Sequence, residues 1–282
     1  MWIYENNDIT KYFNNLVNTL CSISFTINSS GSLQFNGKYD PIKNPTSFID
    51  HANKLLIEHT KPRFNLEDVN NYDSWCFPLL QMGQLNIRQD EFVISEILKN
   101  IESDSNIVIS SPYLNLTSNY KNLLLQSKSE NIKILTTSPE ANGFYTAKDI
   151  SRYIPLAYSA LEEKFYGSVI QRKLQNKINI YEWFIDERWT MHSKGLWISD
   201  FNSSPFLMTI GSPNLGRRSA DRDIEAQICI LTRSQEMQLK IKDELDNLLR
   251  PGTKITEDIF TTPKRKVPYW IKPVVNIFGN YL

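Results

Sequence analysis

The 282-residue sequence has no net charge and few residues of the kinds that mark metal sites or disulfide frameworks. Lys and Arg together number 31, as do Asp and Glu, so the chain lacks the positive field of most nucleic-acid-binding proteins, and we expect no nucleic-acid partner. Only three cysteines are present, Cys21, Cys76 and Cys229, widely spaced in apolar stretches. They indicate reduced intracellular core thiols, and no metal site is expected.

Long apolar runs and targeting signals are also missing. No uncharged apolar stretch approaches the length that spans a bilayer, and the start, MWIYENNDITKYFNN, has the pattern of neither a signal nor a transit peptide. We therefore expect any membrane contact to be peripheral. The tail YWIKPVVNIFGNYL beside the basic run PKRKV suits a membrane interface, and the alternative is that it docks on the domain surface.

The sequence does contain enough apolar residues for a core, arranged with regular periodicity. Hydrophobic residues make up 41% of the chain and aromatic residues 12%. From residue 91 onward, amphipathic segments alternate with short apolar runs bounded by turns. The predicted helices are 91–101, 118–127, 150–174 and 233–250, and the predicted strands are 106–113, 131–139, 177–184, 190–199, 206–212 and 224–231. The pattern predicts an α/β fold, with a mixed sheet flanked by helices on both faces.

The stretch WTMHSKGLWISD contains one of the three histidines. On a strand, alternation would place His192 and Lys194 on one face, so that an imidazole and an ammonium lie side by side. This spacing alone is weak evidence. His59 and Lys61 share it, but they stand at the end of a predicted helix, residues 45–60, before a proline and have no partner motif after them.

A second stretch, TIGSPNLGRRSADRDIEAQI, makes the His192 pair more informative. Gly211 and Ser212 end a predicted strand, and Asn214 follows after a tight turn. Glycine lets a ligand approach the backbone, and short neutral donors with helix-start amides favour an anion. A histidine facing such a phosphate cradle could attack phosphorus or transfer a proton. Glu225 on the next strand could hold one imidazole nitrogen.

These residues resemble the signature of the phospholipase D superfamily, His192-x-Lys194 followed by Gly211-Ser212-x-Asn214. The blocks HSKGLWI, IGSPNLGRRSADRDIEAQI, SPYLNLTSNY and TTSPEANGF resemble more narrowly the family of eukaryotic mitochondrial CDP-diacylglycerol–glycerol-3-phosphate 3-phosphatidyltransferases. The likeness extends over nearly the whole chain. It implies transfer of a phosphatidyl group from CDP-diacylglycerol to glycerol 3-phosphate through a phosphohistidine, in phospholipid and cardiolipin biosynthesis in the mitochondrion, with no cofactor or metal.

The resemblance also implies roles for individual residues. His192, Lys194 and Glu225 would be catalytic, with Glu225 orienting His192, and Lys194, Ser212 and Asn214 would bind the transferred phosphate. Further possible substrate-binding residues are Tyr113, Asn115 and Arg218. Core packing is the alternative for Tyr113, and a solvated turn is the alternative for Arg218. The aspartate that the superfamily usually places five residues after the lysine is absent, because Ser199 stands there.

The sequence contains one such motif, whereas these enzymes join two at one active site. We therefore expect residues 91–282 to be a C-terminal phospholipase D-like domain, and residues 1–90 to be a segment that follows a missing first half. The chain is then either a fragment or the partner of a second motif, in a homodimer or from another polypeptide. Two other functions stay open: a phosphodiesterase or nuclease of the same superfamily, and a non-catalytic subunit or inactive fragment.

Overall fold

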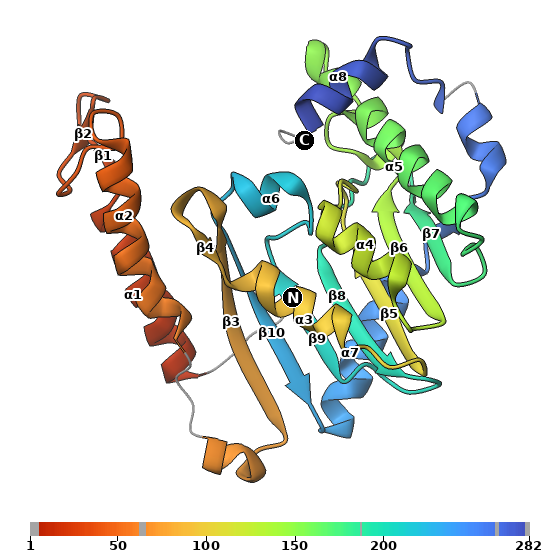
Figure 1. Cartoon of the computed structure of the whole chain (residues 1–282), viewed down its shortest axis with the longest axis horizontal. Helices are drawn as coiled ribbons and strands as arrows, with labels where there is room; N and C mark the ends of the chain where they lie inside the picture. The colour runs from red at the N-terminus through yellow and green to blue at the C-terminus, as the bar shows by residue number, and fades with distance from the viewer. Residues whose placement is uncertain (1–5, 62–65, 187, 263–264, 280–282) are drawn as a thin grey trace.

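A mixed β-sheet forms the centre of the protein (Figure 1). We describe it from a computed structural model that covers residues 6–61, 66–186, 188–262 and 265–279. Within these residues the sheet has nine strands, in the order β11-β7-β6-β5-β8-β9-β10-β3-β4. Their bounds are β3 (Ser74–Met82), β4 (Ile87–Arg88), β5 (Ser105–Ser110), β6 (Asn131–Thr137), β7 (Ile178–Trp183), β8 (Gly195–Asp200), β9 (Leu207–Gly211), β10 (Glu225–Thr232) and β11 (Gly252–Lys254). Strands β5, β6 and β7 run parallel, and the other pairs are antiparallel.

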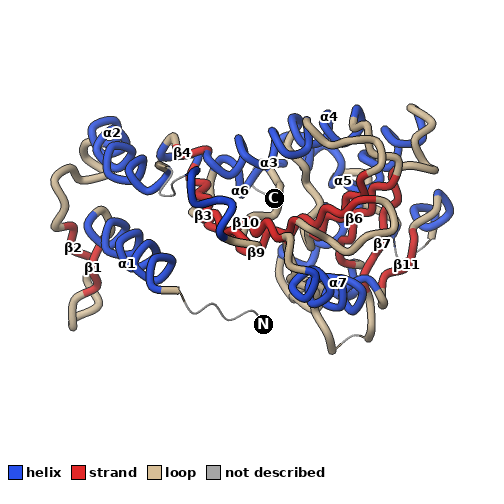
Figure 2. The backbone as a smooth tube through the Cα atoms, turned by 90° about the horizontal axis from the view of Figure 1, so that it is seen from below, coloured by secondary structure: helices blue, strands red, loops and turns tan. Residues whose placement is uncertain are grey.

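Helices cover both faces of this sheet (Figure 2). Helices α3 (Gln89–Lys99), α4 (Ser118–Gln126) and α5 (Ile154–Gln171) lie on one face, and α7 (Gln235–Leu249) lies on the other. Strand β5 shows how the sequence specifies this. Ile107 and Ile109 belong to the core under α3, α4 and α5, while Val108 between them packs in the core under α7. Side chains of a strand alternate between its two faces, so one strand contributes to both cores. The sheet with helices on both faces confirms the predicted α/β fold.

A separate helical layer lies beyond the β3–β4 edge (Figure 1). It consists of α1 (Asn7–Ser22), α2 (Pro45–Leu56) and a hairpin of β1 (Phe25–Ile27) and β2 (Leu33–Phe35). Tyr12 and Leu56 from the helices share a buried cluster with Leu80 and Ile87 from the sheet. The Asn6 side chain caps α1 by accepting from two main-chain amides, at 2.8 and 3.0 Å.

The smaller helical elements connect these layers. They are η1 (Ile57–Thr60), η2 (Leu66–Asn71), η3 (Gly83–Leu85), η4 (Pro139–Ala141), η5 (Ile150–Tyr153), α6 (Arg217–Asp221), η6 (Glu257–Thr261) and α8 (Ile271–Phe278). Helix α8 packs against α5 through Ile271 and Val275, which share a buried cluster with Ala157. The described part of the tail therefore docks on the domain, although Tyr269 beside it is 90% exposed.

Two details differ from the sequence-based expectations. The nine-residue strand β3 was not predicted. It carries Pro78 in its middle, which is tolerated because β4 pairs only with Gln81 and Met82, leaving β3 an edge strand at the proline. Cys229 is buried, but Cys21 is exposed, so the expectation that all three cysteines are core thiols was wrong.

The predicted boundary at residue 90 separates a segment that follows a missing first half, residues 1–90, from the phospholipase D-like domain, residues 91–282. It stays a prediction. The sheet itself runs across that position, since eight residues of β3 pair with β10. The first ninety residues therefore contribute directly to the sheet that carries the site.

Candidate functional site

Four chain segments meet at one edge of the sheet and, together with the β6–α5 segment and the start of α5, enclose a cavity of about 540 Å³. Strand β8 begins there, β9 ends there, β10 begins there and the loop after β5 starts there, because neighbouring antiparallel strands bring starts and ends together. The cavity is lined by Tyr113, Phe144, Ile154, Tyr158, His192, Lys194, Gly211, Ser212, Asn214, Gly216, Arg218, Ser219, Asp223 and Glu225. Most of the site residues named from the sequence thus share one cavity.

His192 lies in the loop before β8, and the prediction that it sits on a strand was wrong. Strand β8 begins only at Gly195, so side-chain alternation does not place His192 beside Lys194. The loop is instead fixed by neighbouring segments: Ser110 Oγ donates to the Ser193 carbonyl at 3.1 Å, and the Met191 amide donates to Ala141 at 3.2 Å. His192 and Lys194 do contact each other, but the loop brings them together and strand alternation does not.

Lys194 contacts the imidazole directly. Its Nζ lies 3.2 Å from both Nδ1 and Nε2 of His192 and donates to the His192 carbonyl at 3.2 Å. Burial, and then the Lys194 charge, lower the pKa of His192 below its usual value. Burial also lowers the pKa of Lys194, and Glu225 opposes this shift. His192 is therefore neutral at pH 7, the form that has a free lone pair for attack on phosphorus.

The turn after β9 is shaped by close packing against β10. A Cβ atom added at Gly211 would lie 2.2 Å from Gln227 Cβ, so only glycine fits at this point. The Ser212 amide donates to the Ala226 carbonyl at 3.1 Å. Beyond the turn, Leu215 adopts a left-handed conformation (φ 54°), and its carbonyl accepts from Thr117. The loop after β5 thus helps to hold the turn in place.

Asn214 presents an unsatisfied amide at this turn. Its main-chain N–H donates to Ser219 Oγ at 3.1 Å, while its Oδ1 is buried and has no hydrogen-bond partner among the described residues. The other end of the amide, Nδ2, donates to Ser219 Oγ at 3.5 Å, and this hydroxyl donates its own proton to Glu225. The buried end is therefore the acceptor oxygen. An unpaired buried amide is costly, and a bound ligand that supplies a partner removes the cost.

Glu225 is buried at the start of β10, with only 7% of its surface exposed. Its Oε1 accepts from Ser219 Oγ at 2.9 Å, and its charge acts on Lys194. Within the part of the chain that the structure describes, no hydrogen bond joins Glu225 to His192. Glu225 acts on Lys194, which in turn contacts the imidazole, and its role in orienting His192 stays a prediction.

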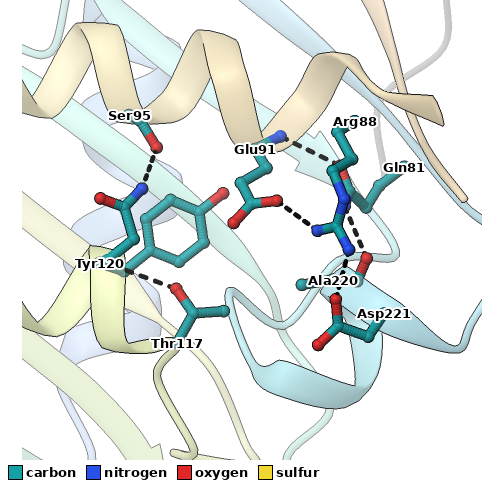
Figure 3. Close-up of polar contacts among 9 residues, drawn as sticks. Gln81, Arg88, Glu91, Ser95, Thr117, Tyr120, Ala220 and Asp221 are labelled. Atoms are coloured by element: carbon teal, nitrogen blue, oxygen red, sulfur yellow. Dashed lines mark hydrogen bonds and ion pairs between the residues drawn. The ribbon is translucent and has the colours of Figure 1, made fainter. Parts of the chain in front are cut away.

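The short helix α6, which carries Arg218 and Ser219, is held from outside the cavity (Figure 3). Gln81 Nε2 donates to the Ala220 carbonyl at 2.7 Å, and Gln81 Oε1 accepts from the Glu91 amide at 3.1 Å. Arg88 bridges Glu91 and Asp221, at 2.6 Å to each. Strand β3 and helix α3 thereby fix the far side of the site.

The possible substrate-binding residues separate into two groups. Tyr113 and Arg218 line the cavity, and the Tyr113 ring meets the His192 ring edge-on at 5.8 Å. Asn115 does not line it. Its buried side chain donates to the Gly279 carbonyl at 2.6 Å, after α8, so here it joins two parts of the fold.

Six lining residues were not singled out from the sequence: Phe144, Ile154, Tyr158, Gly216, Ser219 and Asp223. Ser219 and Asp223 stand within the block that resembles the superfamily, so closeness to Asn214 and Glu225 was an available signal. Phe144 and Tyr158 come from the β6–α5 segment, where no local pattern distinguishes them from packing residues.

Within residues 6–61, 66–186, 188–262 and 265–279, no cluster of three metal-ligating side chains occurs, and no helix is long and apolar enough to cross a bilayer.

The fold and cavity agree with the comparison to known families. Residues 97–249 match the family model described as "Cardiolipin synthase, PLD-like domain", which defines the class as phospholipase D-like. The chain belongs to this family of cardiolipin synthase PLD-like domains, and the resemblance stated from the sequence is confirmed.

Individual relatives extend this comparison. The chain is 36% identical over 301 residues to a probable CDP-diacylglycerol–glycerol-3-phosphate 3-phosphatidyltransferase of Dictyostelium discoideum, covering 99% of this chain and 51% of the relative. It is 32% identical over 301 residues to the mitochondrial enzyme of that name from Bos taurus, covering 97% and 54%. The chain thus spans about half the length of these curated relatives.

A solved structure supports the fold independently. The crystal structure of phosphatidylserine synthase from Haemophilus influenzae Rd KW20 superposes with a TM-score of 0.65 at 16% identity. The superposition covers 95% of this chain and 59% of that protein.

Proposed function

We propose that the protein forms the C-terminal half of a phosphatidyltransferase that moves a phosphatidyl group from CDP-diacylglycerol to glycerol 3-phosphate. One observation carries the proposal: His192, Lys194, Ser212 and Asn214 line a single cavity. The two relatives named for this activity match 97% or more of the chain.

In the first step, a histidine nitrogen attacks the phosphorus atom that bears the diacylglycerol, and the bond to the CMP oxygen breaks. A second histidine gives its proton to that oxygen, so CMP leaves. In the second step, the glycerol 3-phosphate hydroxyl gives its proton to the second histidine and attacks phosphorus, and the P–N bond breaks. His192 acts as one of the two histidines, and Lys194, Ser212 and Asn214 hold the phosphate oxygens.

The second histidine comes from a second His-x-Lys half. In this proposal that half is supplied by a further part of the protein, by another copy of this chain or by another polypeptide. The cavity wall described above then forms one side of a joint active site.

The substrate also requires access to a lipid surface. Phe144 lines the cavity and is 39% exposed, and Trp189, which lies three residues before His192, is 56% exposed. Exposed aromatic side chains suit the interfacial region of a bilayer. We place the protein at a membrane as a peripheral component, and in mitochondria, as for the Bos taurus relative.

The test is CMP release from CDP-diacylglycerol vesicles with glycerol 3-phosphate. The 282-residue protein is assayed alone, over a range of concentrations, and together with the part of the Dictyostelium relative that it does not match. His192→Ala should abolish CMP release, and His51→Ala, on α2, provides a matched control. Equal activity in wild type and His192→Ala would refute the catalytic role.

Other outcomes identify the alternative functions. Cleavage of a nucleic-acid substrate without CMP release would favour a nuclease. Absence of turnover in every combination would favour a non-catalytic subunit.

A further inference from the structure

The cavity lining contains two basic side chains, each with an acidic residue acting on it: Lys194 with Glu225, and Arg218 with Asp223. Lys194 lies against His192 and is acted on by Glu225. At α6, Arg218 Nε lies 3.1 Å from the Asp223 carboxylate, and both side chains line the cavity. Within the described residues, Asp223 is the ion-pair partner of Arg218 and accepts its hydrogen bond from Nε, and the Arg218 side chain is 59% exposed, so a ligand can reach its terminal nitrogens.

The Arg218–Asp223 pair is held by the backbone that ends α6. The Arg218 carbonyl accepts from the Arg222 amide at 2.8 Å and from the Asp223 amide at 3.1 Å. This turn brings Asp223 back beside Arg218. The helix is fixed on its far side by β3 and α3 (Figure 3), so the second pair belongs to a rigid wall.

Aromatic rings form the neighbouring part of the cavity wall. The rings of Tyr113 and Tyr158 lie 5.1 Å apart at an interplanar angle of 33°, and Phe144 lines the same cavity. Burial raises the pKa of both tyrosines, and the Arg218 charge opposes this rise. Arg218 and both tyrosines line the same cavity. A planar apolar surface and a guanidinium thus occur together.

We infer that this wall is a subsite for the leaving nucleotide, a pyrimidine nucleoside monophosphate. The inference rests on the proposed function and deepens it. Lys194, Ser212 and Asn214 hold the transferred phosphate. Arg218 holds the adjacent phosphate of the diphosphate, the aromatic wall contacts the base, and Asp223 accepts from a ribose hydroxyl.

The aromatic wall distinguishes the nucleotide from the acceptor. Glycerol 3-phosphate also carries a phosphate for Arg218, but it has no planar group that gains from aromatic contact. Arg218 also suits the departure of CMP. When the diphosphate bond breaks, the phosphate attached to cytidine becomes a monoester with a charge of about −1.5 to −2 at pH 7. A guanidinium placed at that phosphate stabilises the increase in charge as CMP departs.

Calorimetric titration of the 282-residue protein with CMP tests the subsite without requiring turnover. In Arg218→Gln, CMP affinity should fall by about ten- to a hundredfold, the cost of a charge-assisted hydrogen bond. Arg222→Gln removes the same charge from the end of the same helix, outside the cavity lining, and should bind CMP as wild type does. Far-ultraviolet circular dichroism checks that both variants fold.

A second pair of variants tests the aromatic wall. Tyr158→Phe keeps the ring and should retain CMP affinity, whereas Tyr158→Leu should weaken CMP binding and leave the binding of ribose 5-phosphate unchanged. Absence of CMP binding in wild type, or equal CMP affinity in wild type and Arg218→Gln, would overturn the inference. A loss of glycerol 3-phosphate affinity with unchanged CMP affinity would also overturn it, by assigning Arg218 to the acceptor.

Failure of the proposed function is recognised separately. It appears as absence of CMP release from CDP-diacylglycerol in the complemented wild-type assay. If CMP release occurs and Arg218→Gln leaves CMP affinity unchanged, the function stands and the subsite is wrong.

Discussion

Two charged regions of the protein differ in what their charges contact. Lys194 and Arg218 line the cavity, and the Asn214 Oδ1 atom in the same lining has no hydrogen-bond partner among the described residues. Behind α5, by contrast, Glu162, Glu182 and Arg265 are all less than 10% exposed. Both terminal nitrogens of Arg265 donate to the Glu182 carboxylate, which ties the segment before α8 to strand β7.

The difference indicates different uses of the same residue types. In the buried cluster the ion pair of Arg265 and Glu182 fixes one chain segment against another, and one Glu162 carboxyl oxygen stays without a hydrogen-bond partner among the described residues. In the cavity, Lys194 and Arg218 each hydrogen-bond to a neighbouring protein group through part of their donors, and the remaining donors can bind a ligand. Substitutions in the cavity should therefore change activity more than stability, and substitutions in the buried cluster should do the reverse.

The largest expected effect is on catalysis. His192→Ala should lower the rate of CMP release by about 10⁴-fold or more, because it removes one of two groups that act as a unit. The melting temperature should stay close to that of wild type, since the half-exposed ring contributes little to the core. A large loss of stability would show that this region, like the buried cluster, serves the fold.

Next in size is a change in the free energy of unfolding. Arg265→Met should destabilise the protein by about 3–5 kcal/mol, because it leaves the buried Glu182 carboxylate without its partner. Urea denaturation measures the change, and Lys266→Met, one residue further on, is the control. Equal stability of the two variants would contradict the assignment of Arg265 as an anchor.

A smaller effect concerns the pH dependence of stability. Burial, and then Glu182, raise the pKa of Glu162 well above its usual value, so the folded state binds an extra proton. Stability from this group is fully present below the unfolded-state pKa of about 4.3 and is lost as pH rises to the folded-state pKa. Glu162→Gln should flatten this fall. Denaturation midpoints measured between pH 4 and pH 8 test it, and an unchanged slope would count against a protonated Glu162.

The smallest effect is on the titration of the cavity histidine. Burial and then the Lys194 charge lower the pKa of His192, so Lys194→Met should move that pKa upward while burial continues to oppose it. Two-dimensional NMR of the imidazole protons follows the titration, with Lys61→Met as the control. If the His192 pKa is the same in both variants, the ammonium does not act on the ring.

The sequence anticipated the fold where local patterns were strong. β6 and β7 were apolar runs bounded by turns, and α7 had clear helical periodicity, so their types and approximate bounds were predicted correctly. β3 was missed because Pro78 interrupts the strand pattern, and only its place at the edge makes the proline acceptable. Local propensity does not encode which neighbours a strand has.

The same division applies to the site. The sequence specified which groups are present: the His192–Lys194 pair, the glycine that permits close packing at position 211, and Asn214 after it. Tertiary structure alone decided that Tyr158 from α5 joins them, that Glu225 contacts Ser219 instead of His192, and that Asn115 supports the tail. Chemistry is fixed by residue identity, but contact depends on how separate strands and loops meet at one sheet edge, and that follows from the packing of the whole chain.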